Sequence, residues 1–299
     1  MTDERATVRP VTLARLVELT HACEDEAQST EDIETALDVS HRRARETILE
    51  ATRIDLLQEN GPDDDPVYTT TYVGESFLKA IRAENWETVS SVLSTQSPHY
   101  GTFLEVLGEV EPTDLDTLLE HLEENQQYTP YTFNQTSVEV LGDWAERLGR
   151  IQRNAFTGSY YLTDEGEPPR NFQYILLGAY DDLEQTAGVN LRQRYLSIPR
   201  LREEVCERTG CRRSDFDEML VELCQQNVGK LELSGAPMDT AAKDAAFGIK
   251  QIDLASDDGL VSTSQSTQQV MAGVEQYDKQ YYYIAVYDRD IAFKPEDSK

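Results

Sequence analysis

The chain has 299 residues, with 56 acidic and 27 basic side chains and a formal net charge of −29. At about 100–200 residues per domain, this length predicts two or three small domains. The sequence contains no apolar run of about 18 residues, which argues against a membrane span, and its charge argues against indiscriminate polyanion binding.

The N-terminal region predicts three helices in close succession. Apolar residues between positions 11 and 19 recur at helical spacing. Ser29 and Asp32 match a capping box that starts a second helix. Ser40 then stands as the N-cap of a third helix, over residues 41–52. The residues expected to be buried on this helix are Ala44, Ile48 and Leu49, and those expected outside are Arg42, Arg43 and Arg45.

A two-stranded ribbon is predicted directly after the third helix. Its strands cover residues 54–57 and 67–73, and a loop rich in Gly, Pro and Asp joins them. Three helices followed by a ribbon is the element order of a winged helix-turn-helix. Residues 29–57 and 67–78 resemble that superfamily, in particular the winged domains of archaeal regulators. The resemblance implies a recognition helix over residues 41–52, with the ribbon as the wing.

The same pattern recurs further along the chain. Thr113 and Asp116 form a capping-box pattern before one helix, and a second helix is expected over residues 134–148. Strands at residues 151–155 and 160–163, hinged at Gly158, would then form a second wing.

A third copy is predicted beyond residue 190. Ser197 would cap a helix that ends at Gly210, and Ser214 with Asp217 would start the next helix. A strand follows at residues 228–233. Near the C-terminus we expect strands at residues 247–254 and 281–287, with a surface helix or a mobile loop over residues 257–275.

The expected fold class is therefore mostly α (α+β), with tandem winged-helix domains that carry short β-hairpin wings. The predicted domains are residues 1–98 with trailing helices, residues 99–168, and residues 169–299 with C-terminal strands.

Basic residues collect in three islands of this acidic chain. Residues 40–53 carry a net charge of +2, residues 147–163 carry +3, and residues 192–213 carry +4. Each island falls on or beside a predicted recognition helix or wing. Arginine suits such a position because its planar guanidinium can pair with phosphate or guanine in bidentate fashion. The residues predicted to bind nucleic acid are Ser40, His41, Arg42, Arg43, Arg45, Arg147, Arg150, Arg153, Arg212 and Arg213.

Catalytic motifs are missing from the sequence. It contains no phosphate-binding loop, no dinucleotide-binding glycine pattern and no zinc-protease motif. The four cysteines, at positions 23, 206, 211 and 224, do not have the spacing of a zinc site and are expected to be reduced. We therefore expect a protein that is not an enzyme, with no cofactor and no metal.

The acidic composition resembles that of haloarchaeal proteins. Only 7 lysines accompany 20 arginines, and aromatic residues remain common. At about 1 M salt the Debye length is roughly 3 Å, so the self-repulsion of such a chain is screened. The N-terminus, MTDERATVRP, has no apolar signal region, and we expect a cytoplasmic location.

Binding of double-stranded DNA is the function that this pattern favours. A transcriptional regulator, or a component of a replication, partition or defence system, would fit it. The alternative is a protein–protein interaction scaffold that uses winged-helix repeats without contacting DNA. A homodimer or other protein partners stay open, and no membrane association is expected.

Overall fold

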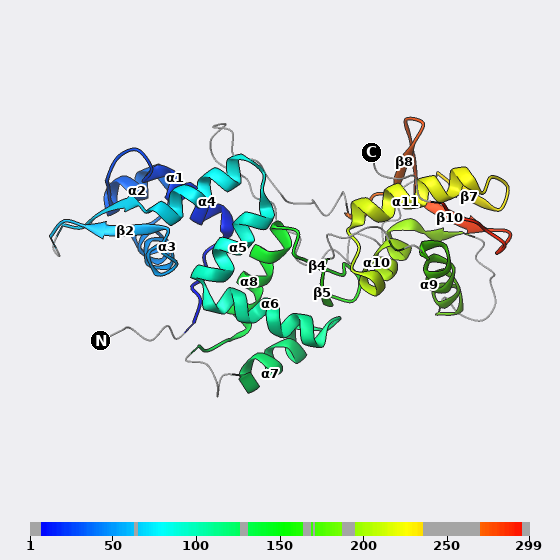
Figure 1. Cartoon of the computed structure of the whole chain (residues 1–299), viewed down its shortest axis with the longest axis horizontal. Coiled ribbons are helices and arrows are strands. Elements are labelled where there is room, and N and C mark those ends of the chain that lie inside the picture. Colours follow the sequence, from blue (N-terminus) through cyan, green and yellow to red (C-terminus); the bar gives the residue numbers. More distant parts are fainter. Residues whose placement is uncertain are drawn as a thin grey trace. The chain divides into compact units, whose positions relative to one another are not determined.

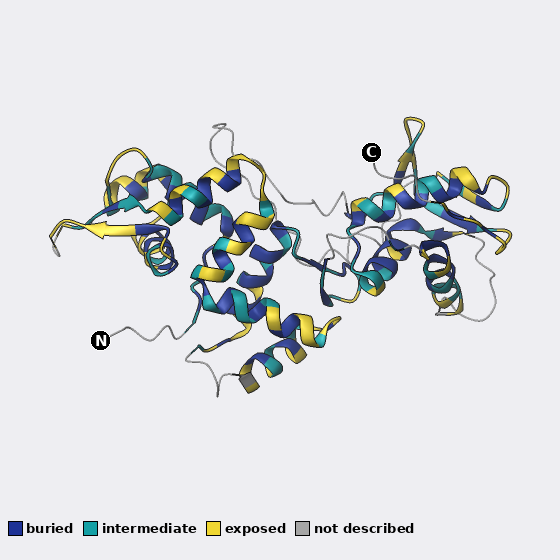
Figure 2. Cartoon of the chain, in the orientation of Figure 1, coloured by how far each residue is buried: buried dark blue, intermediate teal, exposed yellow. Residues whose placement is uncertain are grey.

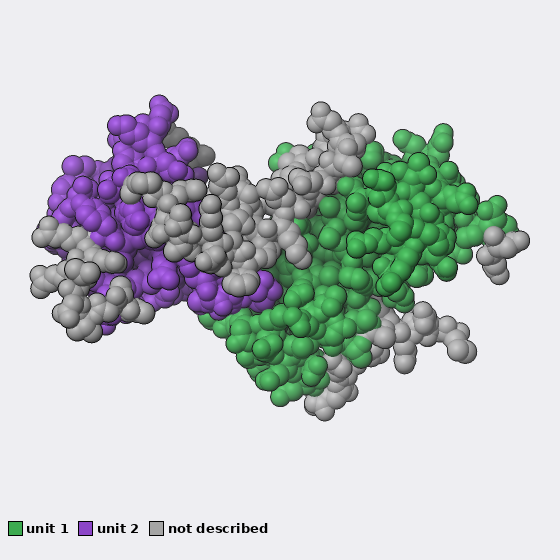
Figure 3. All heavy atoms as spheres, turned by 180° about the vertical axis from the view of Figure 1, so that it is seen from behind, with its two compact units in different colours: residues 1–151, 250–264 green, residues 152–249, 265–299 purple. Residues whose placement is uncertain are grey.

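A computed structural model describes residues 7–62, 65–125, 131–163, 169, 171–186, 195–235 and 270–294. The chain divides into two compact units, which Figure 3 colours separately: residues 1–151 with 250–264 form the first, and residues 152–249 with 265–299 form the second. Helices dominate both units, and the strands form small sheets, so the fold is mostly α in the α+β class (Figure 1). No helix in these ranges is long and apolar enough to cross a membrane.

The division into units reflects which residues pack together. The predicted domains rest instead on a repeated order of elements, and their boundaries at residues 98 and 168 stay a prediction.

The first unit begins with three helices and a small sheet. The strands pair antiparallel in the order β1-β3-β2, and α2, α3 and the β2–β3 hairpin lie at one end of the unit (Figure 1). The elements are α1 (Leu13–Ala22), β1 (Gln28–Ser29), α2 (Thr30–Leu37), α3 (His41–Arg53), β2 (Leu57–Asn60) and β3 (Val67–Thr70).

Local sequence explains where α2 starts and stops. The Ser29 hydroxyl accepts a hydrogen bond from the Asp32 backbone N–H, and the Asp32 carboxylate accepts one from the Ser29 N–H, which confirms the predicted capping box. Asp38 ends the helix with a left-handed φ of 48°, a conformation that Asp tolerates better than most residues. Three residues then lead into α3, whose N-cap is Ser40 as predicted.

Five further helices, α4 to α8, complete the described part of the first unit. Trp144 is fully buried, and its indole N–H donates to the carbonyl of Val11 at 2.9 Å, which ties the last helix to the start of the first. Asp114, and not Thr113, caps α7, because its carboxylate accepts from the Thr117 N–H at 2.8 Å. The helices are α4 (Tyr72–Arg82), α5 (Trp86–Gln96), α6 (Pro98–Val110), α7 (Leu115–Asn125) and α8 (Gln135–Arg147).

The second unit holds two more sheets and a further hairpin. Strands β6, β10 and β7 pair antiparallel in the order β6-β10-β7, while β4–β5 and β8–β9 are two-stranded. The elements are β4 (Ile151–Arg153), β5 (Tyr160–Leu162), α9 (Phe172–Thr186), β6 (Leu196–Ser197), α10 (Ile198–Thr209), α11 (Arg213–Gln226), β7 (Leu231–Ser234), β8 (Val274–Gln276), β9 (Lys279–Tyr281) and β10 (Tyr283–Val286). β4 begins at the last residue of the first unit.

A series of six elements recurs in the two units, with the hairpin β8–β9 inserted before the last strand of the second series. The series α1-β1-α2-α3-β2-β3 corresponds to α9-β6-α10-α11-β7-β10, and the sheet orders β1-β3-β2 and β6-β10-β7 correspond as well. A serine at the end of the first strand caps the next helix in both, Ser29 in one and Ser197 in the other. In both, a left-handed residue, Asp38 or Gly210, opens a three-residue turn between the last two helices.

Several predicted boundaries were wrong. β2 starts at Leu57, about three residues late, because Ile54 still caps α3. β3 ends at Thr70, since Thr71 caps α4. The expected Ser214–Asp217 box does not form, because α11 starts two residues earlier with Arg212 as its N-cap.

Two further differences concern packing and strand division. Leu49 is 42% exposed, while Thr47 and Ala51 are buried with the rest of the inner face of α3. The C-terminal strand predicted over residues 281–287 is divided between β9 and β10. The strand predicted at residues 247–254 and most of the segment 257–275 lie outside the described residues.

Candidate nucleic-acid interface

Helix α3 presents a basic outer face next to a buried inner face. Ala44, Ile48 and Ala51 are buried in the first unit, whereas the polar side chains of the first two turns point outward because the helical period places them on the opposite side. The exposed residues that the sequence predicted are Ser40, His41, Arg42, Arg43 and Arg45.

Arg42 and His41 on this face form ion pairs that are exposed to solvent. Arg42 Nε lies 3.0 Å from Glu46 Oε1, but the Arg42 side chain is 87% exposed. His41 Nδ1 lies 2.5 Å from Glu34 Oε1 and is also exposed. Such surface pairs contribute about 0–1 kcal/mol to stability and exchange readily, so both side chains can turn to an incoming anion.

Arg43 and Arg45 are the least engaged cations of the helix. Within the described part of the chain neither guanidinium forms an ion pair or a hydrogen bond, and both side chains are exposed. Burial raises the pKa of Tyr68, and the positive charge of Arg45 opposes this increase. No other electrostatic effect of Arg45 is seen in the described part of the chain. These two residues are therefore available to a ligand without breaking an existing contact.

A cleft of about 540 Å³ opens beside the start of α3. Its lining brings Arg15 from α1 together with Arg42 and Arg43 from α3, and Glu46 is the single acidic residue among the lining residues. Ser40 makes no side-chain capping bond, so its hydroxyl does not engage the N–H groups of the first turn. Guanidinium groups next to a helix N-terminus form a favourable environment for phosphate.

Arg15 was not predicted as a site residue. It lies on the predicted first helix, 25 residues before Ser40, and its NH1 donates to the Leu37 carbonyl at 2.8 Å and to Glu18 at 2.7 Å. Only the packing of α1 against the α2–α3 turn brings it to the cleft. A spacing pattern within the sequence carries no signal for such a contact.

The β2–β3 hairpin is polar rather than basic. Three of the four β2 residues are exposed (Figure 2). The amides of Gln58 and Asn60 donate to the Thr69 hydroxyl across the strands. Neither strand carries Lys or Arg, so positive charge at this end of the unit comes from α3 and Arg15.

The second predicted basic island does not form a free surface. Arg147 is 5% exposed and pairs with Asp143 at 3.0 Å, so its predicted contact with nucleic acid gains no support. Arg153 is half-buried, donates to the Gly158 carbonyl at 3.2 Å and stacks over Tyr160. Arg150 is half-buried after α8. The sequence marked the positive charge correctly but could not show that it faces inward.

Two arginines of the third island, Arg202 and Arg213, are buried in ion pairs of the second unit, while Arg200 is exposed. Arg213 is buried, and its guanidinium forms two hydrogen bonds with Glu203, at 2.6 and 2.9 Å. It also donates to the Arg153 carbonyl at 2.7 Å. The predicted contact of Arg213 with nucleic acid therefore gains no support, because its guanidinium is buried in a bidentate pair. Arg212 is half-buried as the N-cap of α11.

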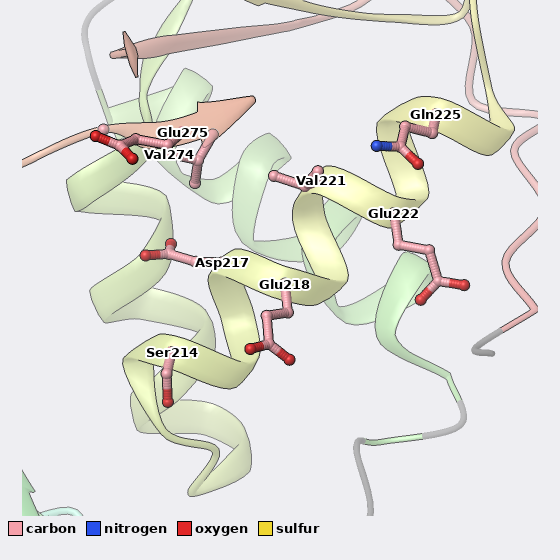
Figure 4. Close-up of a pocket in the computed structure, with 9 residues that line it drawn as sticks. Ser214, Asp217, Glu218, Val221, Glu222, Gln225, Val274 and Glu275 are labelled. Atoms are coloured by element: carbon pink, nitrogen blue, oxygen red, sulfur yellow. The ribbon is translucent and has the colours of Figure 1, made fainter. Parts of the chain in front are cut away.

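The face of α11 carries the opposite charge to that of α3. A cleft of about 520 Å³ lies between α11 and β8. Figure 4 shows the carboxylates of Asp217, Glu218, Glu222 and Glu275 around it, with Val221 and Val274 as its apolar part. Burial raises the pKa of Asp217, although its Arg202 partner opposes this. Such a cleft repels phosphate.

The described residues contain no candidate metal site, and the tyrosines near the C-terminus differ in exposure. No group of three or more His, Cys, Asp or Glu side chains is placed to hold a metal ion there. Of the aromatic residues near the C-terminus, Tyr282 is buried and Tyr281 packs against the core of the second unit.

Comparisons with known proteins give no family. No family model matches the chain, and no curated protein matches it. Among solved structures, one described as a magnesium ion-bound SspB crystal structure aligns with 77% of this chain and 80% of its own. The identity is 13% and the TM-score 0.39, values too low to indicate a shared fold or function.

Proposed function

We propose that the first unit is a winged helix-turn-helix domain that binds double-stranded DNA through α3. The element order α1-β1-α2-α3-β2-β3, with the sheet order β1-β3-β2, supports this. The three-residue turn before α3 matches the connection of a helix-turn-helix. In such domains the second helix of the motif enters the major groove.

The observation that carries the proposal is the exposed arginine cluster at the start of α3. In a chain of net charge −29, Arg42, Arg43 and Arg45 are all exposed on one helix. In the other two islands, Arg147, Arg202 and Arg213 are buried. In the proposed complex, Arg15 and Arg43 hold a backbone phosphate at the cleft. Arg42 and Arg45 contact base edges or the neighbouring phosphates, with His41 at the helix start.

The salt dependence of DNA binding provides the test. Fluorescence anisotropy with a duplex library measures affinity in buffers from about 0.2 to 2 M KCl, since phosphate contacts weaken as salt rises. Arg42→Ala/Arg43→Ala should lower the affinity at least about tenfold and reduce the slope of log K against log salt by about 2.

Lys79→Ala/Arg289→Ala is the matched control, because it removes the same charge from exposed positions outside α3. It should bind like the wild type. Equal and weak binding by the wild type and Arg42→Ala/Arg43→Ala would overturn the proposal.

A separate observation concerns the second unit and argues against DNA contact there. Its α11 occupies the position of α3 in the shared element order, yet its face carries an acidic cleft and its first arginine, Arg213, is buried. We therefore propose that this unit does not contact DNA. Charge reversal on α11, such as Glu218→Lys, should leave the affinity for duplex DNA within about twofold of the wild type when both are measured at the same salt concentration.

A further inference from the structure

Two cysteines lie side by side where α10 turns into α11. Cys206 is on the last turn of α10, and Cys211 is in the three-residue connection to α11. Their sulfur atoms are 3.7 Å apart, and both side chains are buried. In the described part of the chain, neither Cys23 nor Cys224 has a comparable contact with another cysteine.

The end of α10 creates this contact. Gly210 adopts a left-handed φ of 69°, and its N–H donates to the Cys206 carbonyl at 2.8 Å. This reverses the chain so that Cys211 returns to the turn that carries Cys206. The Cys211 N–H also donates to the Thr209 hydroxyl at 3.3 Å, which fixes the backbone of the turn.

We propose that Cys206 and Cys211 form a dithiol site that a hydroperoxide oxidises to an intramolecular disulfide. A disulfide has an S–S distance of about 2.05 Å, so the sulfurs need to approach by about 1.7 Å from their present 3.7 Å. A rotation of the Cys206 or Cys211 side chain about its Cα–Cβ bond brings the sulfurs closer without a change in the backbone of the turn. The site is independent of the proposed DNA contact on α3.

The two thiols have different roles in the reaction. The hydrogen-bond contact with the Cys206 thiol lowers the pKa of Cys211, whereas burial raises the pKa of Cys206 well above its ordinary value. Cys211 is also the less completely enclosed of the two, at 6% exposed against 0%. The thiolate is the nucleophile in thiol oxidation, so Cys211 attacks first.

The chemistry balances with the hydroperoxide as oxidant. The Cys211 thiolate attacks one peroxide oxygen, the O–O bond breaks, and Cys211 becomes a sulfenic acid while the leaving oxygen takes up a proton. The Cys206 sulfur then attacks the sulfenyl sulfur, loses its proton and releases water. Two electrons pass from the two sulfurs to the peroxide, and the disulfide remains.

Mass spectrometry of the whole chain tests the site. The reduced protein is treated with hydrogen peroxide in its folded state, then unfolded in guanidinium chloride with a thiol alkylating agent. We expect two of the four thiols to escape alkylation. Digestion with trypsin should give residues 203–208 linked to residues 209–212, which separate on reduction.

Matched variants locate the reacting pair. Cys23→Ala and Cys224→Ala remove buried thiols outside the pair and should leave the linked peptide unchanged. Cys206→Ala or Cys211→Ser should abolish it, and should leave Cys211 or Cys206 to be alkylated or oxidised alone. Where a variant does not fold, the peptide map of the wild type still decides.

Two results would overturn the proposal. One is that all four thiols of the wild type remain alkylatable after peroxide treatment. The other is that the linked peptide arises only when peroxide is added after unfolding, together with pairs that involve Cys23 or Cys224.

Discussion

At the scale of single residues, burial decides what each arginine does. Arg42 and Arg213 both pair with a glutamate, at 3.0 and 2.6 Å. The first pair lies at the surface, with the Arg42 side chain 87% exposed, while both members of the second are buried. Coulomb interactions are weaker in water than in the protein interior. The first pair therefore leaves Arg42 available to a ligand, whereas the second pair stabilises the second unit.

Truncation of Arg213 should therefore destabilise the second unit strongly. Arg213→Ala leaves the Glu203 carboxylate buried without its cation, and we expect the free energy of unfolding to fall by about 3–5 kcal/mol. Arg42→Ala is the control and should cost at most about 1 kcal/mol, because its ion pair is exposed. Denaturant unfolding in about 2 M KCl measures both, and similar losses for the two variants would contradict this assignment.

The Glu24–Arg82 pair should make stability depend on pH. Hydrogen bonds from Arg82 at 2.5 and 2.7 Å lower the pKa of Glu24 from 4.5 to about 2. Since the native pKa lies below the unfolded one, the pair stabilises the fold above about pH 4.5, and this contribution is lost as the pH falls toward 2.

Glu24→Gln provides the measurement. Its deficit in the free energy of unfolding relative to the wild type should be full near about pH 6 and should shrink by about pH 3. Glu87→Gln removes the same charge from an exposed position and serves as the control. A deficit of equal size at both pH values would refute the role of this pair.

At the scale of elements, helix starts differ in how far side chains fix them. Ser29 caps α2 through its hydroxyl, whereas Ser40 occupies the same position before α3 without a capping hydrogen bond. The same N-cap position in two helices therefore does not imply that the two serine side chains stabilise them equally.

Alanine substitution should separate the two serines. Ser29→Ala should lower the free energy of unfolding by about 1 kcal/mol, the usual value for loss of a side-chain cap. Ser40→Ala should cost only a few tenths of that, and if Ser40 contacts phosphate it should weaken DNA binding instead. Thermal unfolding measures the first effect and anisotropy the second. Equal destabilisation by both variants would show that the Ser40 hydroxyl does cap α3 in solution.

At the scale of the whole molecule, charge dominates. A net charge of −29 on 299 residues produces self-repulsion that destabilises the compact state unless salt screens it. The unfolding midpoint should therefore rise as KCl increases from about 0.1 to 1 M, while DNA affinity falls over the same range. Parallel denaturation and anisotropy titrations test the opposed trends. A midpoint that does not change with KCl would show that self-repulsion is unimportant for this fold.

Local rules in the sequence predicted the helices well. The α2 capping box, the position of Ser40 and the ends of α10 at Ser197 and Gly210 all follow from contacts between residues a few positions apart. Strand limits were less accurate, as at β2 and β3, because a strand is defined by a partner that is distant in sequence.

The sequence by itself determined the mostly helical class, the starts of α2, α3 and α10 and the location of the three basic islands, because these depend on local hydrogen bonds, helical period and composition. The tertiary structure alone decided which arginines reach the surface, since burial and ion pairing depend on segments far apart in the chain. It turned Arg147 and Arg213 inward, brought Arg15 to the cleft of α3 and gave α11 an acidic face. No local pattern encodes these differences, because each results from the packing of one helix against another.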